Sequence, residues 1–430
     1  LGMMVNAIYN LVDAYFVGGL GTSQMGAISV VYPLGQVVVG LGLLFGNGAA
    51  SYLSRLLGNG DKEKADKVAS TALYSSITVG AIMIIFSVIF LQPILKLLGA
   101  TDSILPYAIT YASIYIVSCI FNVFNVTMNN IVTSEGAAKT TMLALMAGAI
   151  LNIGLDPVFI YVLDMGVAGA AIATAISQIV STLVYLTFVL RKKSVYHFKI
   201  KNCTFTKEIM SEIFKIGIPT LVFQILTSLS ISLVNTQARP YGDSVIAGMG
   251  AVTRVVSMGS LMVFGFIKGF QPIAGYSYGA KKFDRLHEAI KTSIIWSTVF
   301  CVIYGVVLTV FSKEIISQFT KGDLEMIRVG TQSLRINGIS FILFGFYTVY
   351  SSLFLALGKG LAGFILGAYR QGICFVPVIL ILPMFWGING ILYVQPIADV
   401  LSAIITIFMA LHLHKELDVT KQKFLSEKAG

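Results

Sequence analysis

The chain has 430 residues, of which 56% are hydrophobic and only 12% are charged, and its mean hydropathy is +0.84. A soluble globular protein carries about 25% charged residues, so this composition argues against a soluble enzyme. The many aromatic and aliphatic residues also exclude a disordered chain. The net charge of +10 would suit a nucleic-acid-binding protein, but its distribution along the chain points elsewhere.

Long stretches without a charged residue predict membrane-spanning helices, because about 20 apolar residues cross a bilayer. The first stretch runs from Asp13 to Arg55, and residues 18–23 supply a glycine-rich turn that divides it. Strands of a membrane barrel would alternate in polarity instead. The sequence therefore predicts an all-α membrane protein with twelve spanning helices, at residues 1–19, 25–50, 68–98, 104–133, 140–163, 167–190, 209–237, 245–275, 289–318, 327–357, 361–384 and 389–413.

Residue 1 already belongs to the apolar pattern of the first helix. No basic segment and no cleavage site precede it, so a signal peptide is not predicted. We expect the natural start of the chain, with part of the first helix, to lie upstream of Leu1.

Lysine and arginine residues collect in loops on one side of the predicted helices. The positive-inside rule then places both termini in the cytoplasm. Topology, rather than binding to nucleic acid, accounts for the positive charge, and we expect a multi-pass membrane protein. The densest basic group lies after the sixth helix and comprises Arg191, Lys192, Lys193, Lys199, Lys201 and Lys207.

No motif for a cofactor, a metal cofactor or an enzymatic nucleophile is present. The four cysteines are scattered and form no paired motif, which argues against a zinc site or a disulfide framework. The glycines at 40, 42, 46 and 48 resemble a phosphate-binding loop only superficially, since they lie in an apolar helix. Small residues there permit close helix packing instead. We therefore expect neither an enzyme nor a bound cofactor.

An internal repeat relates the two halves of the chain. A shift of 221 residues brings Gly21 onto Gly242 and Asp102 onto Asp323, with further identities in between and beyond. We infer an N-terminal six-helix lobe at residues 1–193, a basic cytoplasmic linker at 194–208, and a C-terminal six-helix lobe with a short basic tail at 209–430. Two parallel bundles that rock about a central cavity are typical of a transporter.

Acidic residues inside the predicted helices mark a candidate ion site, because a carboxylate in the bilayer costs at least about 2.5–3.5 kcal/mol. Asn152 and Asp156 are spaced four residues apart and so share one helix face. Asp13 and Thr174 lie at a similar depth, and Asn129 is a weaker fifth member. Their oxygen atoms suit Na⁺. They also suit a proton, because two neighbouring carboxylates held out of water are hard to keep ionised together.

Each of these residues also has a structural interpretation. Asp156 precedes Pro157 and would cap a broken helix, and Asp13 would bond to a neighbouring helix. Glu135 stands near a cytoplasmic helix end, where an interfacial role is favoured. Asp399 is expected to form a structural pair with Arg370 or Lys268.

Polar and aromatic residues of the second half are candidates for a substrate cavity. The chain holds 28 Phe, 19 Tyr and 15 Met, and flexible or aromatic walls suit varied flat or cationic ligands. Ordinary lipid and helix packing is the alternative for any one of them. The candidates in this half are Gln224, Asn235, Gln271, Tyr276 and Tyr278, and Glu135 joins them from the first half.

Four segments resemble motifs of the MATE family of multidrug and toxic compound extrusion proteins, in particular its MepA-like bacterial branch. They are residues 10–18 (NLVDAYFVG), 54–61 (SRLLGNGD), 152–157 (NIGLDP) and 271–280 (QPIAGYSYGA). The resemblance covers essentially the whole chain and implies twelve helices in two lobes, the fold of the MOP transporters. It also implies cation-coupled export of organic, often cationic, drugs.

The same resemblance implies site residues. Asp13, Asn152, Asp156 and Thr174 match a first-lobe cation site, with Asn129 a looser match, and Tyr9 and Tyr111 match tyrosines that line that lobe. Some branches of the family carry coupling carboxylates in helices 7 and 10. Here helix 7 offers only Glu212 near its start, and helix 10 offers none beyond Glu325 before it. No second-lobe ion site of that pattern is expected.

The sequence thus predicts a monomeric antiporter that exports drugs or toxic organic cations across the lipid bilayer in exchange for H⁺ or Na⁺. The main alternative is a flippase for a lipid-linked or polysaccharide precursor, which would need a basic cavity, and Arg254, Lys268 and Arg335 keep it open. An intramembrane enzyme lacks a recognisable catalytic group. A gated channel would be excluded by transport against a gradient.

Overall fold

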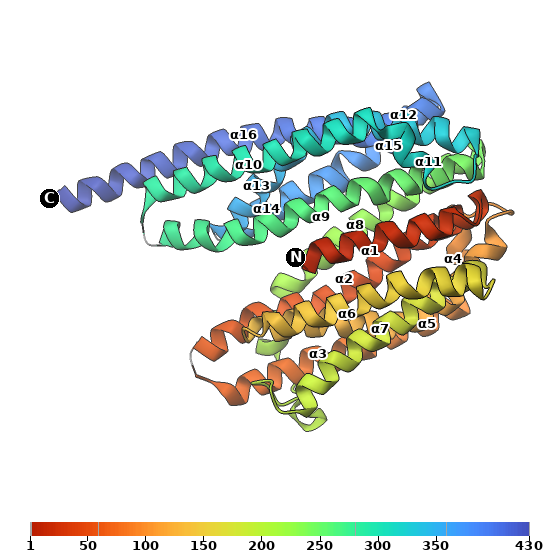
Figure 1. Ribbon diagram of the computed structural model, residues 1–430. Coiled ribbons are helices and arrows are strands. Elements are labelled where there is room, and N and C mark those ends of the chain that lie inside the picture. The colour runs from red at the N-terminus through yellow and green to blue at the C-terminus, as the bar shows by residue number, and fades with distance from the viewer. Residues whose placement is uncertain (1, 59, 280, 358, 430) are drawn as a thin grey trace. The chain divides into compact units, whose positions relative to one another are not determined.

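The computed structural model describes residues 2–58, 60–279, 281–357 and 359–429. Every regular element in these ranges is helical (Figure 1). The chain divides into two compact units: unit 1 comprises Leu1–Gly250 and Gln318–Met326, and unit 2 comprises Ala251–Ser317 and Ile327–Gly430.

Unit 1 contains the N-terminal helices and also the helix that follows the basic linker. Its elements are α1 (Gly2–Gly18), α2 (Thr22–Gly58), α3 (Lys62–Ile89), α4 (Leu91–Leu97), α5 (Leu105–Ser134), α6 (Ala138–Pro157), η1 (Val158–Val162), α7 (Gly166–Leu190), η2 (Ile200–Asn202), α8 (Lys207–Ala238), η3 (Arg239–Tyr241) and the first turns of α9 (Asp243–Gly279).

Unit 2 contains the rest of α9 and the C-terminal helices. Its further elements are α10 (Phe283–Val310), α11 (Ser312–Ser317), most of α12 (Leu324–Ser340), α13 (Ile342–Ala356), α14 (Gly360–Ala368), η4 (Tyr369–Ile373), α15 (Phe375–Trp386) and α16 (Ile388–Ala429).

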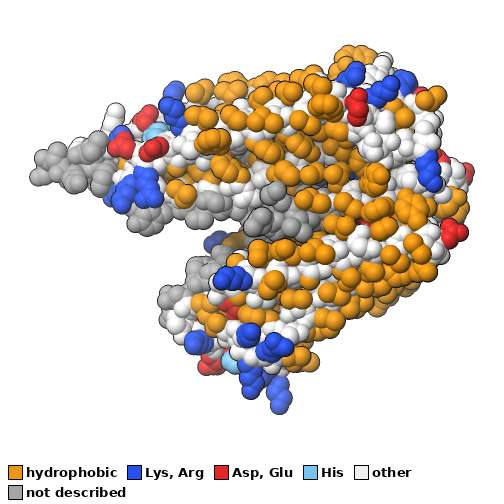
Figure 2. Space-filling view, in the orientation of Figure 1, with side chains coloured by type: hydrophobic (Ala, Val, Ile, Leu, Met, Phe, Trp, Pro, Cys, Tyr) orange, Lys and Arg blue, Asp and Glu red, His pale blue; other side chains and the backbone are white. Residues whose placement is uncertain are grey.

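The expected all-α, multi-pass membrane architecture is confirmed. Among the described residues, ten helical segments are long and apolar enough to cross a membrane, and α12 with α13, bent by 50°, make an eleventh. The 17-residue α1 stands where the first span was expected. Figure 2 shows hydrophobic side chains over the flanks of the helices, while charged side chains gather near helix ends.

Several expected spans are interrupted, and proline explains two of the breaks. Proline has no N–H group, and its ring crowds the carbonyl four residues earlier. Pro93 therefore cannot continue α3, which ends at Ile89, and it stands instead in the first turn of α4. Pro157 ends α6, and the wider π-turn η1 follows it directly. A sequence count of apolar residues cannot see such breaks, because the residues on both sides remain apolar.

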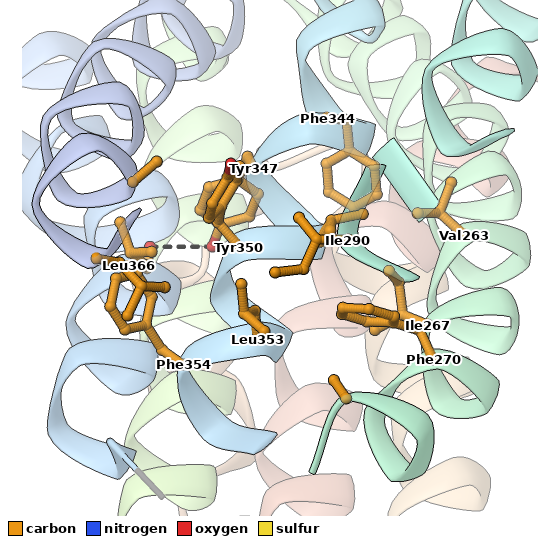
Figure 3. Packing of buried hydrophobic residues seen from close by; sticks show 14 of the residues in the cluster. Val263, Ile267, Phe270, Ile290, Phe344, Tyr347, Tyr350, Leu353, Phe354 and Leu366 are labelled. Atoms are coloured by element: carbon orange, nitrogen blue, oxygen red, sulfur yellow. Dashed lines mark hydrogen bonds between the residues drawn. The ribbon is translucent and has the colours of Figure 1, made fainter. Parts of the chain in front are cut away.

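A row of aromatic side chains on α13 forms the centre of unit 2. Phe344, Tyr347 and Tyr350 recur every three residues and so lie on one helix face. Figure 3 shows them packed with Ile267 of α9 and Leu366 of α14, and the Tyr347 hydroxyl donates to the Leu366 carbonyl at 3.0 Å. This core joins α9, α10, α13, α14 and α16 in one cluster.

Helices α2 and α8 pack closely in unit 1 because small residues let their backbones approach. A Cβ atom at Gly217 would lie 2.0 Å from the Leu44 carbonyl oxygen, and one at Gly48 would lie 2.3 Å from that of Ile213. The expected packing role of the glycines in α2 is thereby confirmed for Gly48.

A proline in the same interface receives its missing hydrogen bond from the neighbouring helix. Pro33 lies inside α2 and cannot donate to the carbonyl of Ser29. The side chain of Asn235, which is buried on α8, donates to that carbonyl at 2.9 Å. In an apolar surrounding an unpaired carbonyl is expensive, so Asn235 stabilises the α2–α8 contact.

We expect Asn235→Leu to destabilise the protein by about 1–3 kcal/mol, the usual loss when a buried acceptor becomes unsatisfied. The measurement is thermal or denaturant unfolding in detergent. Pro33→Ala restores the N–H donor to α2, so Asn235→Leu should be much less damaging in that background. An equal loss in both backgrounds would show that Asn235 acts by packing and not through the Ser29 carbonyl.

Candidate functional site

The four residues of the predicted cation site lie on three neighbouring helices of unit 1. Asp13 comes from α1, Asn152 and Asp156 come from α6, and Thr174 comes from α7. Helix α6 packs against both α1 and α7. All four side chains are buried, and Asn152 and Asp156 are fully inaccessible to solvent. The structure thus brings these residues together inside a membrane-spanning bundle.

Asn152 connects two members of the cluster. With its amide oriented to satisfy both neighbours, it donates to Asp156 Oδ2 at 3.1 Å and accepts from the Thr174 backbone N–H at 3.3 Å. In the opposite orientation its nitrogen lies 3.5 Å from Thr174 Oγ1. The two orientations differ only by exchange of the amide oxygen and nitrogen. In either orientation Asn152 contacts Thr174, so it joins α6 to α7.

The charge nearest to Asp156 is another carboxylate. Asp13 lies close enough for the two charges to interact, and the second oxygen of Asp156, Oδ1, is buried without a hydrogen-bond partner among the described residues. Two buried carboxylates with amide and hydroxyl oxygens form an oxygen-rich site that a proton or a hard cation would neutralise.

The local backbone positions these groups. The spacing of four residues puts Asn152 and Asp156 on one face of α6, and Pro157 then ends the helix directly after Asp156. In the π-turn η1, the Tyr161 hydroxyl donates to the Phe16 carbonyl of α1 at 2.5 Å. This bond holds α1 against the end of α6, three residues after Asp13.

Asn129 makes its contact elsewhere. Its amide donates to the Tyr185 hydroxyl at 3.2 Å, between α5 and α7. Sequence reasoning missed a neighbouring polar group in which Asn125 donates to Gln178 Oε1 and accepts from Thr182, both at 2.9 Å. The signal was available, since Gln178 and Thr182 follow Thr174 at intervals of four residues on α7.

The substrate-cavity candidates are dispersed over unit 1 and α9. Tyr111 is buried on α5 with its ring stacked on Tyr115, at 5.6 Å between centroids. Gln224 is half-buried on α8 beside Gly40 of α2. The side chains of Tyr9, Gln271 and Tyr276 lie outside the described residues.

Glu135 ends α5 and holds the basic linker. Its Oε2 accepts from the Val195 N–H at 2.7 Å and from the Ser194 hydroxyl at 2.9 Å. Burial raises the pKa of this carboxyl, while the two hydrogen bonds act in the opposite direction. The structure therefore connects Glu135 to residues 194–195, at the interfacial helix end that was expected for it.

Unit 2 contains a buried ion pair. Arg370 Nε lies 2.8 Å from Asp399 Oδ1, and the Arg370 and Asp399 side chains are only 11% and 5% exposed. Gln395 and Ser340 each donate to the same carboxylate at 2.8 Å. The guanidinium also lies 4.7 Å from the ring centroid of Phe344. Of the two partners expected for Asp399, the structure places Arg370 beside it, and the two charges are balanced within the protein.

Comparison with known proteins identifies this fold as that of a membrane transporter. A sequence model of the MatE family matches residues 1–158 and 219–381. Two curated relatives are named Multidrug export protein MepA. The one from Staphylococcus saprophyticus is 30% identical over 426 residues, and the one from Staphylococcus aureus strain NCTC 8325 is 31% identical over 427 residues. Both alignments cover 99% of this chain and 94% of the relative.

Solved structures agree with the sequence matches. A multidrug resistance MATE family transporter of the MOP superfamily in its inward-facing conformation aligns with a TM-score of 0.90 and 25% identity, covering 98% of this chain and 96% of that chain. An outward-facing structure of such a transporter aligns with a TM-score of 0.78 and 26% identity, covering 97% and 94%. The chain belongs to the MatE family.

We expect the ion pair of unit 2 to be structural, and its substitutions test this. Arg370→Met or Asp399→Leu alone should destabilise the protein by about 3–5 kcal/mol, because each leaves a buried charge without its partner. The double variant should recover most of the loss, since no charge then remains buried. Unfolding in detergent measures all three variants.

The exposed pair of Lys67 and Glu63, one helical turn apart on α3 at 2.8 Å, is the matched control. Removing either partner there should change stability little, because water solvates the charge that remains. If the double variant at Arg370 and Asp399 is as unstable as the single variants, the structural interpretation is wrong.

Proposed function

We propose that this protein is a secondary-active multidrug efflux antiporter. It exports organic, often cationic, compounds in exchange for H⁺ or Na⁺, as a monomer, by alternating access of two lobes at residues 1–193 and 209–430 joined by the linker 194–208. The observation that carries this proposal is the buried pair of Asp13 and Asp156 with Asn152, in a chain of the MatE family whose relatives are named multidrug export proteins.

The coupling follows from the charge of the site. An ion that enters neutralises one carboxylate, so the loaded and empty sites differ by one buried charge. Conformations that differ in how they solvate the site then differ in ion affinity, and an inward gradient shifts the population between them. The drug is exported if it binds more tightly to the conformation that binds the ion less tightly.

The location of the protein follows from its basic loops. The concentration of lysine and arginine in loops on one side supports an orientation with both termini in the cytoplasm, and the relatives from Staphylococcus support a bacterial cytoplasmic membrane. Membership of a transporter family supports transport over catalysis, and the proposed antiport needs only the coupling ion and no cofactor.

We expect Asp13→Asn and Asp156→Asn each to abolish gradient-driven efflux of a fluorescent organic cation from proteoliposomes, while the variants remain folded. Asparagine keeps a similar shape but cannot exchange a charge with the ion. The exposed Asp102→Asn is the matched control and should leave efflux unchanged. Full efflux in either site variant would show that the carboxylate does not couple transport.

The coupling ion is decided by imposing the sodium and pH gradients separately on the same liposomes. An antiporter coupled to one ion should export the dye under that gradient and should lose this response in both site variants. Equal export without any gradient would indicate a channel and would contradict the proposal.

The flippase alternative requires free cations that face a central cavity. Of the three basic candidates, Arg335 donates to the Ser312 hydroxyl at 2.9 Å, Arg254 is buried, and the Lys268 side chain lies outside the described residues.

We expect no movement of a lipid-linked sugar pyrophosphate in liposomes that export the dye. Movement of this lipid without dye export would favour the flippase.

A further inference from the structure

The basic linker is a fixed strap and not a loose loop. Between α7 and α8 its backbone is bonded to α3: the Lys199 N–H donates to the Ser70 hydroxyl at 3.2 Å, and the Thr204 N–H donates to that of Thr71 at 2.8 Å. The His197 N–H donates to Asp66 at 2.9 Å. We call residues 191–207, which run from the end of α7 to the first residue of α8 and include most of the linker, the strap.

The strap has an inward face that carries its aromatic residues. Tyr196 is 2% exposed, its hydroxyl lies 3.0 Å from that of Ser134, and its ring packs edge-on against Phe198. Tyr196 and Phe198 pack with the buried residues of unit 1. These contacts fix which side chains of the strap can point outward.

The outward face combines cations with large apolar side chains. Ile200 is 73% exposed and Phe205 is 69% exposed. Lys199 and Lys201 flank Ile200 and are exposed, as are Arg191, Lys192, Lys193 and Lys207. Large apolar side chains exposed among lysines are unusual on a surface that contacts only water.

The acidic residues nearby are already engaged. Glu135 and Asp66 bond to the strap itself, and Glu208 pairs with Lys64 of α3 at 2.5 Å. Among the described residues, no carboxylate forms a salt bridge with Lys199 or Lys201. The outward cations therefore remain available for an anion from outside the protein.

The position of the strap indicates which kind of anion binds its outward face. It begins where the span Gly166–Leu190 ends and is bonded to the first turns of the span Lys62–Ile89. The ends of membrane-spanning helices are expected at the level of the lipid headgroups. In Figure 2, lysine and arginine side chains gather at the end of unit 1 where α3 begins and α7 ends. Polybasic segments bind anionic headgroups, and adjacent apolar side chains bury themselves in the interface.

We propose that the outward face of the strap is a docking surface for anionic phospholipids. Lys199 and Lys201 bind the phosphate groups, and Ile200 and Phe205 enter the boundary of the acyl chains. Such binding anchors the segment that joins α7 to α8 in the plane of the membrane. The inference concerns membrane attachment and does not depend on which ion drives transport.

The test is the affinity of the detergent-purified full chain for phosphatidylglycerol, measured by native mass spectrometry, with neutral phosphatidylcholine as the reference lipid. Each lysine near an anionic surface contributes about fivefold, so Lys199→Gln with Lys201→Gln should weaken phosphatidylglycerol binding by about 25-fold. Binding of phosphatidylcholine should not change. Ile200→Ser with Phe205→Ser should weaken both lipids, because this pair contributes apolar burial and not charge.

The matched control removes the same charge from loops that the positive-inside rule predicts on the opposite side of the membrane. Lys313 and Lys321 are also exposed, and Lys313→Gln with Lys321→Gln should leave phosphatidylglycerol affinity within about twofold, since exposed charges beyond about 10 Å are screened. Equal weakening in the control would show an effect of net charge alone. Unchanged binding in the Lys199 and Lys201 variant, or equally tight binding of a short oligonucleotide to the same lysines, would overturn the proposal.

Discussion

The constraint on which this structure depends is that polar groups inside an apolar membrane must find their partners within the protein. Two of the buried polar clusters meet this requirement. The Ser29 carbonyl, released by Pro33, accepts from Asn235, and Asp399 is surrounded by Arg370, Gln395 and Ser340. Each cluster joins helices that are distant in the chain, by 206 residues between Ser29 and Asn235 and by 29 between Arg370 and Asp399. Each leaves no net charge to be neutralised from outside.

The acidic cluster of unit 1 differs from these in one physical respect. Asp156 meets a second carboxylate, and one of its oxygens has no hydrogen-bond partner among the described residues. A buried group of this kind is costly unless something else neutralises it. The free-energy cost of burying the carboxylate serves transport if the species that neutralises it is the ion that drives transport. Unit 2 thus holds a balanced ion pair, whereas unit 1 holds an acidic pair.

The backbone of the strap also finds its hydrogen-bond partners within the protein. Its inward bonds to Ser70, Thr71 and Glu135 satisfy the backbone, so its outward cations and apolar residues are held in place rather than left to move. A segment fixed in this way can present phosphate-binding and acyl-binding groups together, which a disordered basic linker could not do without losing conformational entropy. The linker is thereby part of unit 1 rather than a passive connection.

The sequence by itself determined the class of the protein, the all-α membrane fold and the face that Asn152 and Asp156 share, because apolar length and helical periodicity are local properties. It also limited the partner of Asp399 to Arg370 or Lys268, because a buried charge inside a span needs an opposite one; in the structure the partner is Arg370. Only the tertiary structure decided that Asn152 bonds to Asp156 and Thr174, that Asn129 bonds to Tyr185, and that Asn235 completes the helix interrupted at Pro33. Those contacts join residues that are distant in the chain, and they depend on how the helices pack and turn about their axes, which no local pattern records.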